Sequence, residues 1–176
     1  MNIQQEQPEH YTETEKIVKV AFLNAEHSDG KEHLLVKRLR SADAFIPELS
    51  LVAIDKATER LVGHVLLTKI EINDGDRRTP SLALAPVSVL PDFQNQGIGS
   101  SLIKTALVKA AGLGYESVVV LGYPAYYPKF GFKQAAAWGV RAPFDVPIEA
   151  FMALELVDGA LQDAAGVVAY HPAFFE

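Results

Sequence analysis

The feature that most constrains this chain is a junction where an extended apolar run passes through a glycine-containing loop into a long helical segment. Residues 79–90 form the extended run, and residues 97–111 place isoleucine, leucine and alanine at helical spacing. Gly97 and Gly99 lie where the loop meets the helix. Glycines at a helix start let an anion approach backbone N–H groups at the positive end of the helix dipole. The pattern therefore predicts a strand, a loop and a helix that could hold a phosphate.

Two known kinds of phosphate loop do not fit these residues. A P-loop needs a lysine and then Ser or Thr directly after its second glycine, but Ser100 follows Gly99 and the first lysine is Lys104. A dinucleotide-binding loop needs a small residue where Leu102 stands, within a βαβ unit that opens the fold. A glycine-rich helix start without any ligand stays open on these residues alone.

A proline interrupts the extended run before the loop. Pro86 has no backbone N–H to donate, so a central strand could not accommodate it without losing a ladder bond. The run is therefore expected to contain a bulge or to leave its neighbouring strand near Pro86.

The rest of the chain alternates strand-like and helix-like segments without a linker or repeat, which predicts a single domain over residues 1–176. The expected fold class is α+β (mixed α/β) with about six or seven strands. The predicted elements are a strand at 2–5, helices at 13–25 (with Thr12 as N-cap) and 31–40, strands at 50–55 and 61–72 joined by the link 56–60, a strand at 117–121, a helical turn at 124–127, and strands at 132–136, 150–157 and 167–170.

Composition excludes several classes of protein. The 176 residues include no cysteine, which rules out a disulfide scaffold, thiolate metal sites and a cysteine nucleophile. The formal charge is -6 and no dense basic cluster is present, so nucleic-acid binding is not expected. The N-terminus has no signal-peptide pattern and no apolar run reaches membrane-spanning length. We therefore expect a cytoplasmic protein without membrane association.

Two ordered motifs resemble the GNAT superfamily of N-acetyltransferases. Residues 87–102 resemble its signature, whose Q/R-x-x-G-x-G/A core is matched by Gln94, Gly97 and Gly99. Its second landmark, a tyrosine four residues before Gly-Phe, is matched by Tyr127. His64 in Val-Gly-His-Val and the segment 121–128 are similar to the bacterial YhbS-like branch of this superfamily.

This resemblance implies a GNAT fold, with a central, mostly antiparallel sheet that is splayed in the middle and flanked by about four helices. It also implies acetyl-coenzyme A as the acetyl donor and a primary amine of a small molecule or peptide as the acceptor, with a monomer and a homodimer both open. Tyr127 is then the candidate catalytic acid, since a phenol is protonated at neutral pH. The implied cofactor-binding residues are Val87, Ser88, Val89, Gln94, Asn95, Gln96, Gly97, Ile98, Gly99 and Ser100.

Several points stay open at the level of sequence. The general base could be His64, Glu71 or water, and a non-catalytic module that binds or senses acyl-coenzyme A is the alternative function. An acyltransferase for a larger acyl group or an oxygen nucleophile is a further alternative. His27, Asp29 and His33 are irregularly spaced, so no metal is expected.

Overall fold

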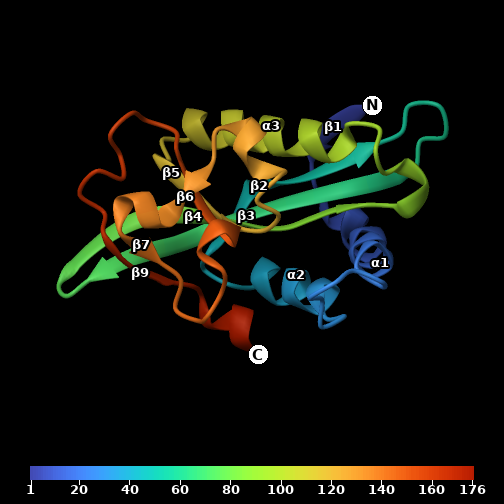
Figure 1. Ribbon diagram of the computed structural model, residues 1–176. Coiled ribbons are helices and arrows are strands. Elements are labelled where there is room, and N and C mark those ends of the chain that lie inside the picture. The colour runs from blue at the N-terminus through green and yellow to red at the C-terminus, as the bar shows by residue number, and fades with distance from the viewer. The chain divides into compact units, whose positions relative to one another are not determined.

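The computed structural model describes residues 1–176, and the chain forms two compact units. Unit 1 comprises Met1–Thr68, Ala85–Lys109 and Pro172–Glu176. Unit 2 comprises Lys69–Leu84 and Ala110–His171. Two long strands, β3 and β4, belong partly to each unit, and Figure 1 labels the main helices and strands. No helix combines the length and apolar character needed to cross a membrane.

Unit 1 holds the helices and the N-terminal strands. Its strands are β1 (Asn2–Gln5), β2 (Phe45–Ile54), the first part of β3 (Leu61–Asp74) and the last part of β4 (Arg77–Val89). Its α-helices are α1 (Tyr11–Ala21), α2 (Glu32–Arg40) and most of α3 (Ile98–Gly112). Short 3₁₀ helices, labelled η, are η1 (Pro8–His10), η2 (Pro91–Phe93) and η6 (Pro172–Phe175).

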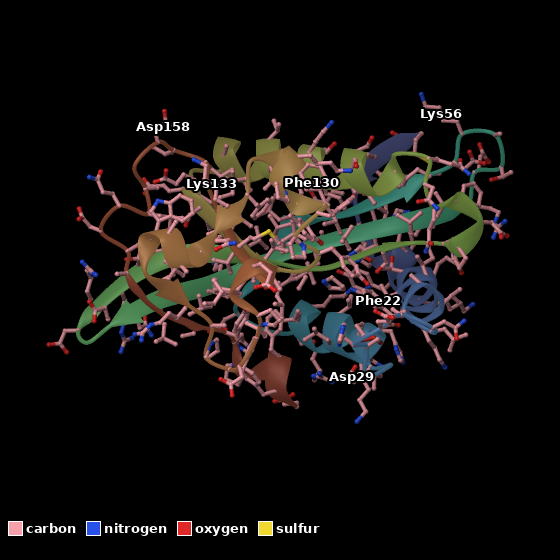
Figure 2. All side chains as sticks on the ribbon, viewed as in Figure 1. Phe22, Asp29, Lys56, Phe130, Lys133 and Asp158 are labelled. Atoms are coloured by element: carbon pink, nitrogen blue, oxygen red, sulfur yellow. The ribbon has the colours of Figure 1, made fainter.

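The sheet of unit 1 lies between two helical layers. Antiparallel pairing joins β1 to β2 and β2 to β3, and α3 covers one face while α1 and α2 cover the other (Figure 1). On the α3 face, Gly63 lies close to Leu102, because a Cβ at Gly63 would come within 3.0 Å of the leucine Cδ1. On the other face a buried cluster includes Phe22 at its edge, which Figure 2 labels. Its buried members are Val18, Val36, Leu39, Leu66 and Ala173.

Unit 2 is built mainly from strands. Its elements are the remaining parts of β3 and β4, β5 (Ser117–Leu121), η3 (Tyr127–Phe130), β6 (Lys133–Gln134), η4 (Ala135–Trp138), β7 (Val140–Arg141), η5 (Ile148–Ala150), β8 (Phe151–Glu155) and β9 (Gly166–Ala169). Strand β8 pairs antiparallel with both β5 and β6, and β9 pairs antiparallel with β3 and parallel with β7.

The pairing of β4 with β5 is short. It is parallel and consists of Leu82 with Val118 and Ala83 with Val119. The ladder ends two residues before the Ala85–Pro86 peptide bond, which is cis. The departure expected near Pro86 is thus consistent with where this ladder stops.

The α+β class and the mostly antiparallel pairing are confirmed, but the number of elements differs from the expectation. There are three α-helices instead of about four, and nine strands instead of six or seven. The prediction of a strand over 132–136 is wrong after Gln134, where three alanines and Trp138 form a 3₁₀ turn that ends at left-handed Gly139. Strand β7 has two residues, too few to show a period in the sequence.

The predicted start of the first helix is also wrong. Thr12 lies inside α1, and the preceding η1 turn begins the helical path at Pro8. The Gln7 N–H donates to His10 Nδ1 at 3.0 Å, which holds that turn. Proline suits the first position of a helical turn because its missing N–H would have no partner there. The helix therefore starts earlier than a threonine cap would place it.

Candidate active site

The glycine loop of unit 1 adopts a left-handed backbone just before α3. Asn95 has φ 62° and Gly97 has φ 82°. The Gln94 side chain donates to the Val89 carbonyl at 3.0 Å and so ties the loop to the end of β4. The first i→i−4 bond of the helix runs from the Ser101 N–H to the Gly97 carbonyl at 3.0 Å. Backbone N–H groups that precede this bond belong to a helix start, where anions bind favourably.

Gly97 is needed for its conformation and leaves open space beside it. Few residues with a side chain adopt a φ of 82°, and a Cβ at this position would meet no atom within 4 Å. The stretch 94–97 is exposed, while Ile98 is buried and anchors the helix start. A ligand can therefore reach the backbone of the loop from solvent.

The last residues of β4 alternate between half-buried and buried positions. Val87 and Val89 are half-buried, whereas Ser88 is 2% exposed and its Oγ has no hydrogen-bond partner. The Leu90 N–H donates to the Val62 carbonyl at 2.8 Å, which fixes this end of β4 against β3. Because the Ser88 side chain points into the interior, a ligand at this edge would meet backbone groups here.

Tyr127 lies in unit 2 within a cluster of aromatic rings. Its ring centroid is 5.1 Å from that of Tyr126 and 5.7 Å from that of Phe132, both in edge-to-face geometry. The Tyr127 side chain is buried, and Phe130, labelled in Figure 2, completes the cluster with a centroid distance of 6.3 Å. Burial, followed by the neighbouring Tyr126 and Tyr123, raises the pKa of Tyr127 to about 12. The phenol is therefore protonated at neutral pH.

A glycine that the motif analysis did not single out shapes the position of Tyr127. A Cβ at Gly122 would overlap the Tyr127 ring at Cε2. The Gly122 N–H donates to the Ala150 carbonyl at 2.9 Å, so the backbone here is fixed and the ring would have to move. The sequence signal for this requirement is only the glycine five residues before the tyrosine.

The two side chains considered as general bases have different surroundings. His64 is fully buried, and its Nε2 is 3.0 Å from Ser50 Oγ. Burial lowers the pKa of His64 to about 4, against the opposing influence of Glu6. Glu71 lies in unit 2, half-buried, and pairs with Ala169 of β9. A histidine with this pKa is neutral at pH 7 and is a weak proton acceptor.

The three residues considered for metal binding do not assemble into a site. No group of three or more histidine and acidic side chains is placed to hold a metal ion. Asp29 instead accepts a hydrogen bond from the Lys31 N–H at 2.8 Å, which is the main cause of its lowered pKa. The carboxylate of Asp29, labelled in Figure 2, thus closes a turn just before α2.

Comparison with known proteins defines the class. The pattern of the "Acetyltransferase (GNAT) family" matches residues 11–132. The chain is 32% identical to the uncharacterized N-acetyltransferase YhbS of Escherichia coli (strain K12), over 88% of this chain and 89% of that protein. It is 36% identical to the uncharacterized N-acetyltransferase YjhQ of Escherichia coli (strain K12), over 68% of this chain and 66% of that protein.

Solved structures agree with this assignment. The crystal structure of YhbS from Escherichia coli in complex with CoA matches with a TM-score of 0.84 and 27% identity, over 99% of this chain and 92% of that chain. A GNAT family acetyltransferase from Brucella melitensis in complex with acetyl-CoA matches with a TM-score of 0.80 and 32% identity, over 98% and 97%. The fold is therefore that of a GNAT acetyltransferase. The chain belongs to the acetyltransferase (GNAT) family, and its similarity to YhbS confirms the predicted branch.

Proposed function

We propose that this protein transfers the acetyl group of acetyl-coenzyme A directly to a primary amine of a small molecule or peptide. The observation that carries the proposal is the left-handed, solvent-open loop at the start of α3, with φ 62° at Asn95 and 82° at Gly97. Relatives that share the whole fold bind CoA or acetyl-CoA, which supports the same donor for this chain.

In this proposal the cofactor is held mainly by backbone groups of unit 1. Amides from Asn95 to Ser100 bind the pyrophosphate at the helix start, where the dipole favours negative charge. The backbone of Val87 and Val89 binds the pantetheine amide and orients the thioester carbonyl. Ser88 contributes its backbone to this stretch, because its side chain is buried. Side-chain identity at these positions then matters less than the path of the backbone.

The chemistry requires a neutral amine, a donor for the departing sulfur and a place for one proton. The amine nitrogen attacks the thioester carbonyl, a C–N bond forms and the C–S bond breaks. His64 is a weak acceptor at neutral pH, so the amine's proton passes to water, with Glu71 as the alternative acceptor. The Tyr127 hydroxyl, which its raised pKa keeps protonated, donates a hydrogen bond to the sulfur as negative charge develops on it, and coenzyme A departs as the thiolate.

A thiol-release assay with acetyl-coenzyme A and a panel of amines tests the reaction. We expect release of coenzyme A above the hydrolysis background with at least one class of amine, together with acetylated product by mass spectrometry. Binding of acetyl-coenzyme A without turnover on any amine or peptide would contradict the transfer reaction and favour the sensing module. Turnover with alcohols or longer acyl groups alone would favour the further alternative.

A loop variant tests cofactor binding separately. Gly97→Val should weaken acetyl-coenzyme A binding at least about tenfold, which corresponds to about 1.4 kcal/mol, measured by calorimetry. Gly30→Val is the matched control, because Gly30 has φ +74° and a Cβ there also meets no atom within 4 Å. Both variants carry the same backbone strain, so only a loss specific to Gly97 supports the phosphate loop. Equal affinity in the two folded variants would refute it.

A further inference from the structure

A line of buried polar groups crosses the sheet of unit 1 beneath α1 and α2. Glu6 continues β1, since its N–H donates to the Ser50 carbonyl of β2 at 2.8 Å. Ser50 Oγ is 2.9 Å from Glu6 Oε1 and 3.0 Å from Nε2 of His64 on β3. All three side chains are buried, and none of them belongs to the glycine loop or to the aromatic cluster.

The charge at one end of this line is compensated. Arg40 at the end of α2 donates to both oxygens of Glu6, at 3.2 Å from Nε and 2.9 Å from Nη2. It also pairs with Glu15 at 3.2 Å and stacks its guanidinium over Tyr11 at 4.1 Å from the ring centroid. Burial raises the pKa of the Glu6 carboxyl, but the charge of His64 when it is protonated at acid pH, together with Arg40, holds the pKa below its usual value. Glu6 is therefore an anion with a fixed partner.

Counting hydrogens then decides the tautomer of His64. A carboxylate only accepts, so the Ser50 hydroxyl donates its single proton to Glu6. Ser50 must accept from His64, which places the imidazole proton on Nε2. The neutral ring is left with an unprotonated Nδ1, and this atom is buried without a hydrogen-bond partner. A bare acceptor in this position costs free energy unless a donor reaches it.

The neighbouring strand supplies a donor at the matching position. Strands β3 and β4 are neighbours in the sheet, and the Leu90 N–H donates to the Val62 carbonyl. Continuing this register antiparallel by two residues along each strand places Ser88 opposite His64. Side chains alternate along a strand, so His64 points away from the α3 face on which Gly63 lies. Ser88 Oγ is buried and also has no partner. Two unsatisfied polar atoms thus belong to facing positions of neighbouring strands.

We propose that His64 is a positioning residue for Ser88: one buried water accepts a hydrogen bond from the Ser88 hydroxyl and donates one to His64 Nδ1. The bridge would hold the stretch Val87 to Val89 in a fixed position against β3. The backbone groups assigned to the pantetheine amide and the thioester carbonyl would then be held with it. Glu6 and Ser50 act at a distance by keeping the proton on Nε2. This inference rests on the proposed function, because it acts through the cofactor-binding part of β4.

A pair of substitutions separates this role from a purely structural one. Asparagine at position 64 ends near the place of Nδ1, whereas glutamine reaches the place of Nε2 and keeps the bond to Ser50. If His64 only supports the buried network, His64→Gln should be the milder change in every measurement. If Nδ1 positions β4, the order reverses for the cofactor: His64→Gln raises the Kd for acetyl-coenzyme A about fivefold, while His64→Asn stays within about twofold.

The same binding titration is run on Ser88→Ala and on Ser88→Ala combined with His64→Gln. We expect each single variant to lose affinity about fivefold and the double variant to lose no more, because both remove one bridge. Long-range proton–nitrogen correlation spectra of the labelled wild type at pH 7 should show His64 protonated on Nε2, and Ser50→Ala should disturb that pattern.

The outcomes separate a failure of the positioning role of His64 from a failure of the proposed function. If the wild type does not bind acetyl-coenzyme A, the proposed function fails. If the wild type binds and His64→Gln binds equally well, or if His64→Asn is the weaker binder, the positioning role is overturned. A proton on Nδ1 in the wild type would overturn it as well. Thermal midpoints recorded for every variant confirm that affinities are compared between folded proteins.

Discussion

Two buried titratable side chains, His64 in unit 1 and Tyr127 in unit 2, are kept neutral by opposite shifts and in different ways. Burial lowers the pKa of His64 to about 4 and raises that of Tyr127 to about 12. His64 is held by hydrogen bonds that lead to a buried ion pair, whereas Tyr127 is held by aromatic packing and by the space at Gly122. The stability contributed by the His64 network should thus depend on charge and pH. The activity that depends on Tyr127 should depend on how its ring packs.

Breaking the ion pair of the His64 network should have the largest effect. Arg40→Met leaves the Glu6 carboxylate without its partner in a site where both side chains are almost fully buried, which should cost about 3–5 kcal/mol of unfolding free energy. Urea denaturation measures it. The double variant Arg40→Met with Glu6→Gln is the control and should recover most of the loss, since no charge is then stranded. A loss below about 1 kcal/mol in the single variant would contradict the buried network.

Acidic pH should lower the free energy of unfolding through the same buried network. The unfolded chain protonates His64 near pH 6.5 and the folded chain only near pH 4, so the unfolded state binds more protons between these values. The free energy of unfolding therefore falls as pH drops from 6.5 to 4, and His64 accounts for about 3 kcal/mol of this fall. Above pH 6.5 the protonation of His64 no longer affects stability. The lowered pKa of Glu6 adds a further loss below about pH 4.5.

Denaturation of the wild type and of His64→Gln across this range measures the contribution of His64. The difference between the two curves isolates it from the carboxyl groups. A constant difference between pH 6.5 and 4 would show that His64 titrates alike in the folded and unfolded chains.

Removing the hydroxyl of Tyr127 should affect turnover far more than structure. Tyr127→Phe keeps the ring and its edge-to-face contacts, so the free energy of unfolding should change little. The Kd for acetyl-coenzyme A should stay within about threefold of the wild-type value. Turnover should fall about 100-fold, near 2.7 kcal/mol of barrier, at the low end for acid assistance because a thiolate leaves readily. Wild-type turnover would remove Tyr127 from the mechanism. Loss of stability and binding together would instead show that packing is its role.

The smallest effect is expected from a substitution at Gly122, beside the Tyr127 ring in unit 2. Gly122→Ala adds a Cβ that overlaps the Tyr127 ring, so the hydroxyl shifts and turnover should fall about tenfold, near 1.4 kcal/mol. Gly112→Ala is the matched control, because a Cβ at Gly112 meets no atom within 4 Å. Steady-state kinetics on both variants provides the comparison. Equal activity in the two would mean that the position of the Tyr127 ring does not limit the reaction.

Much of the fold was readable from local sequence. The strand 117–121 and the helix ending at Arg40 were predicted at or within one residue of their observed bounds, because apolar periodicity and breakers act over a few residues. The strand–loop–helix junction at Gly97 was also readable, and the structure adds that Gly97 has a left-handed backbone, which glycine adopts without strain. Elements of two residues, such as β7, left no such signal.

The sequence by itself determined the family, the order of the longer elements and the residues proposed to hold the cofactor, because these depend on motifs and periods within short stretches. Only the tertiary structure decided the state of His64, which contacts Ser50, 14 residues away, in a network where Glu6 meets Arg40 34 residues away and Ser50 44 residues away. The same holds for Tyr127 and its phenol pKa. Burial and charge at a point in space depend on segments that are distant along the chain, and local propensity carries no information about which of them meet.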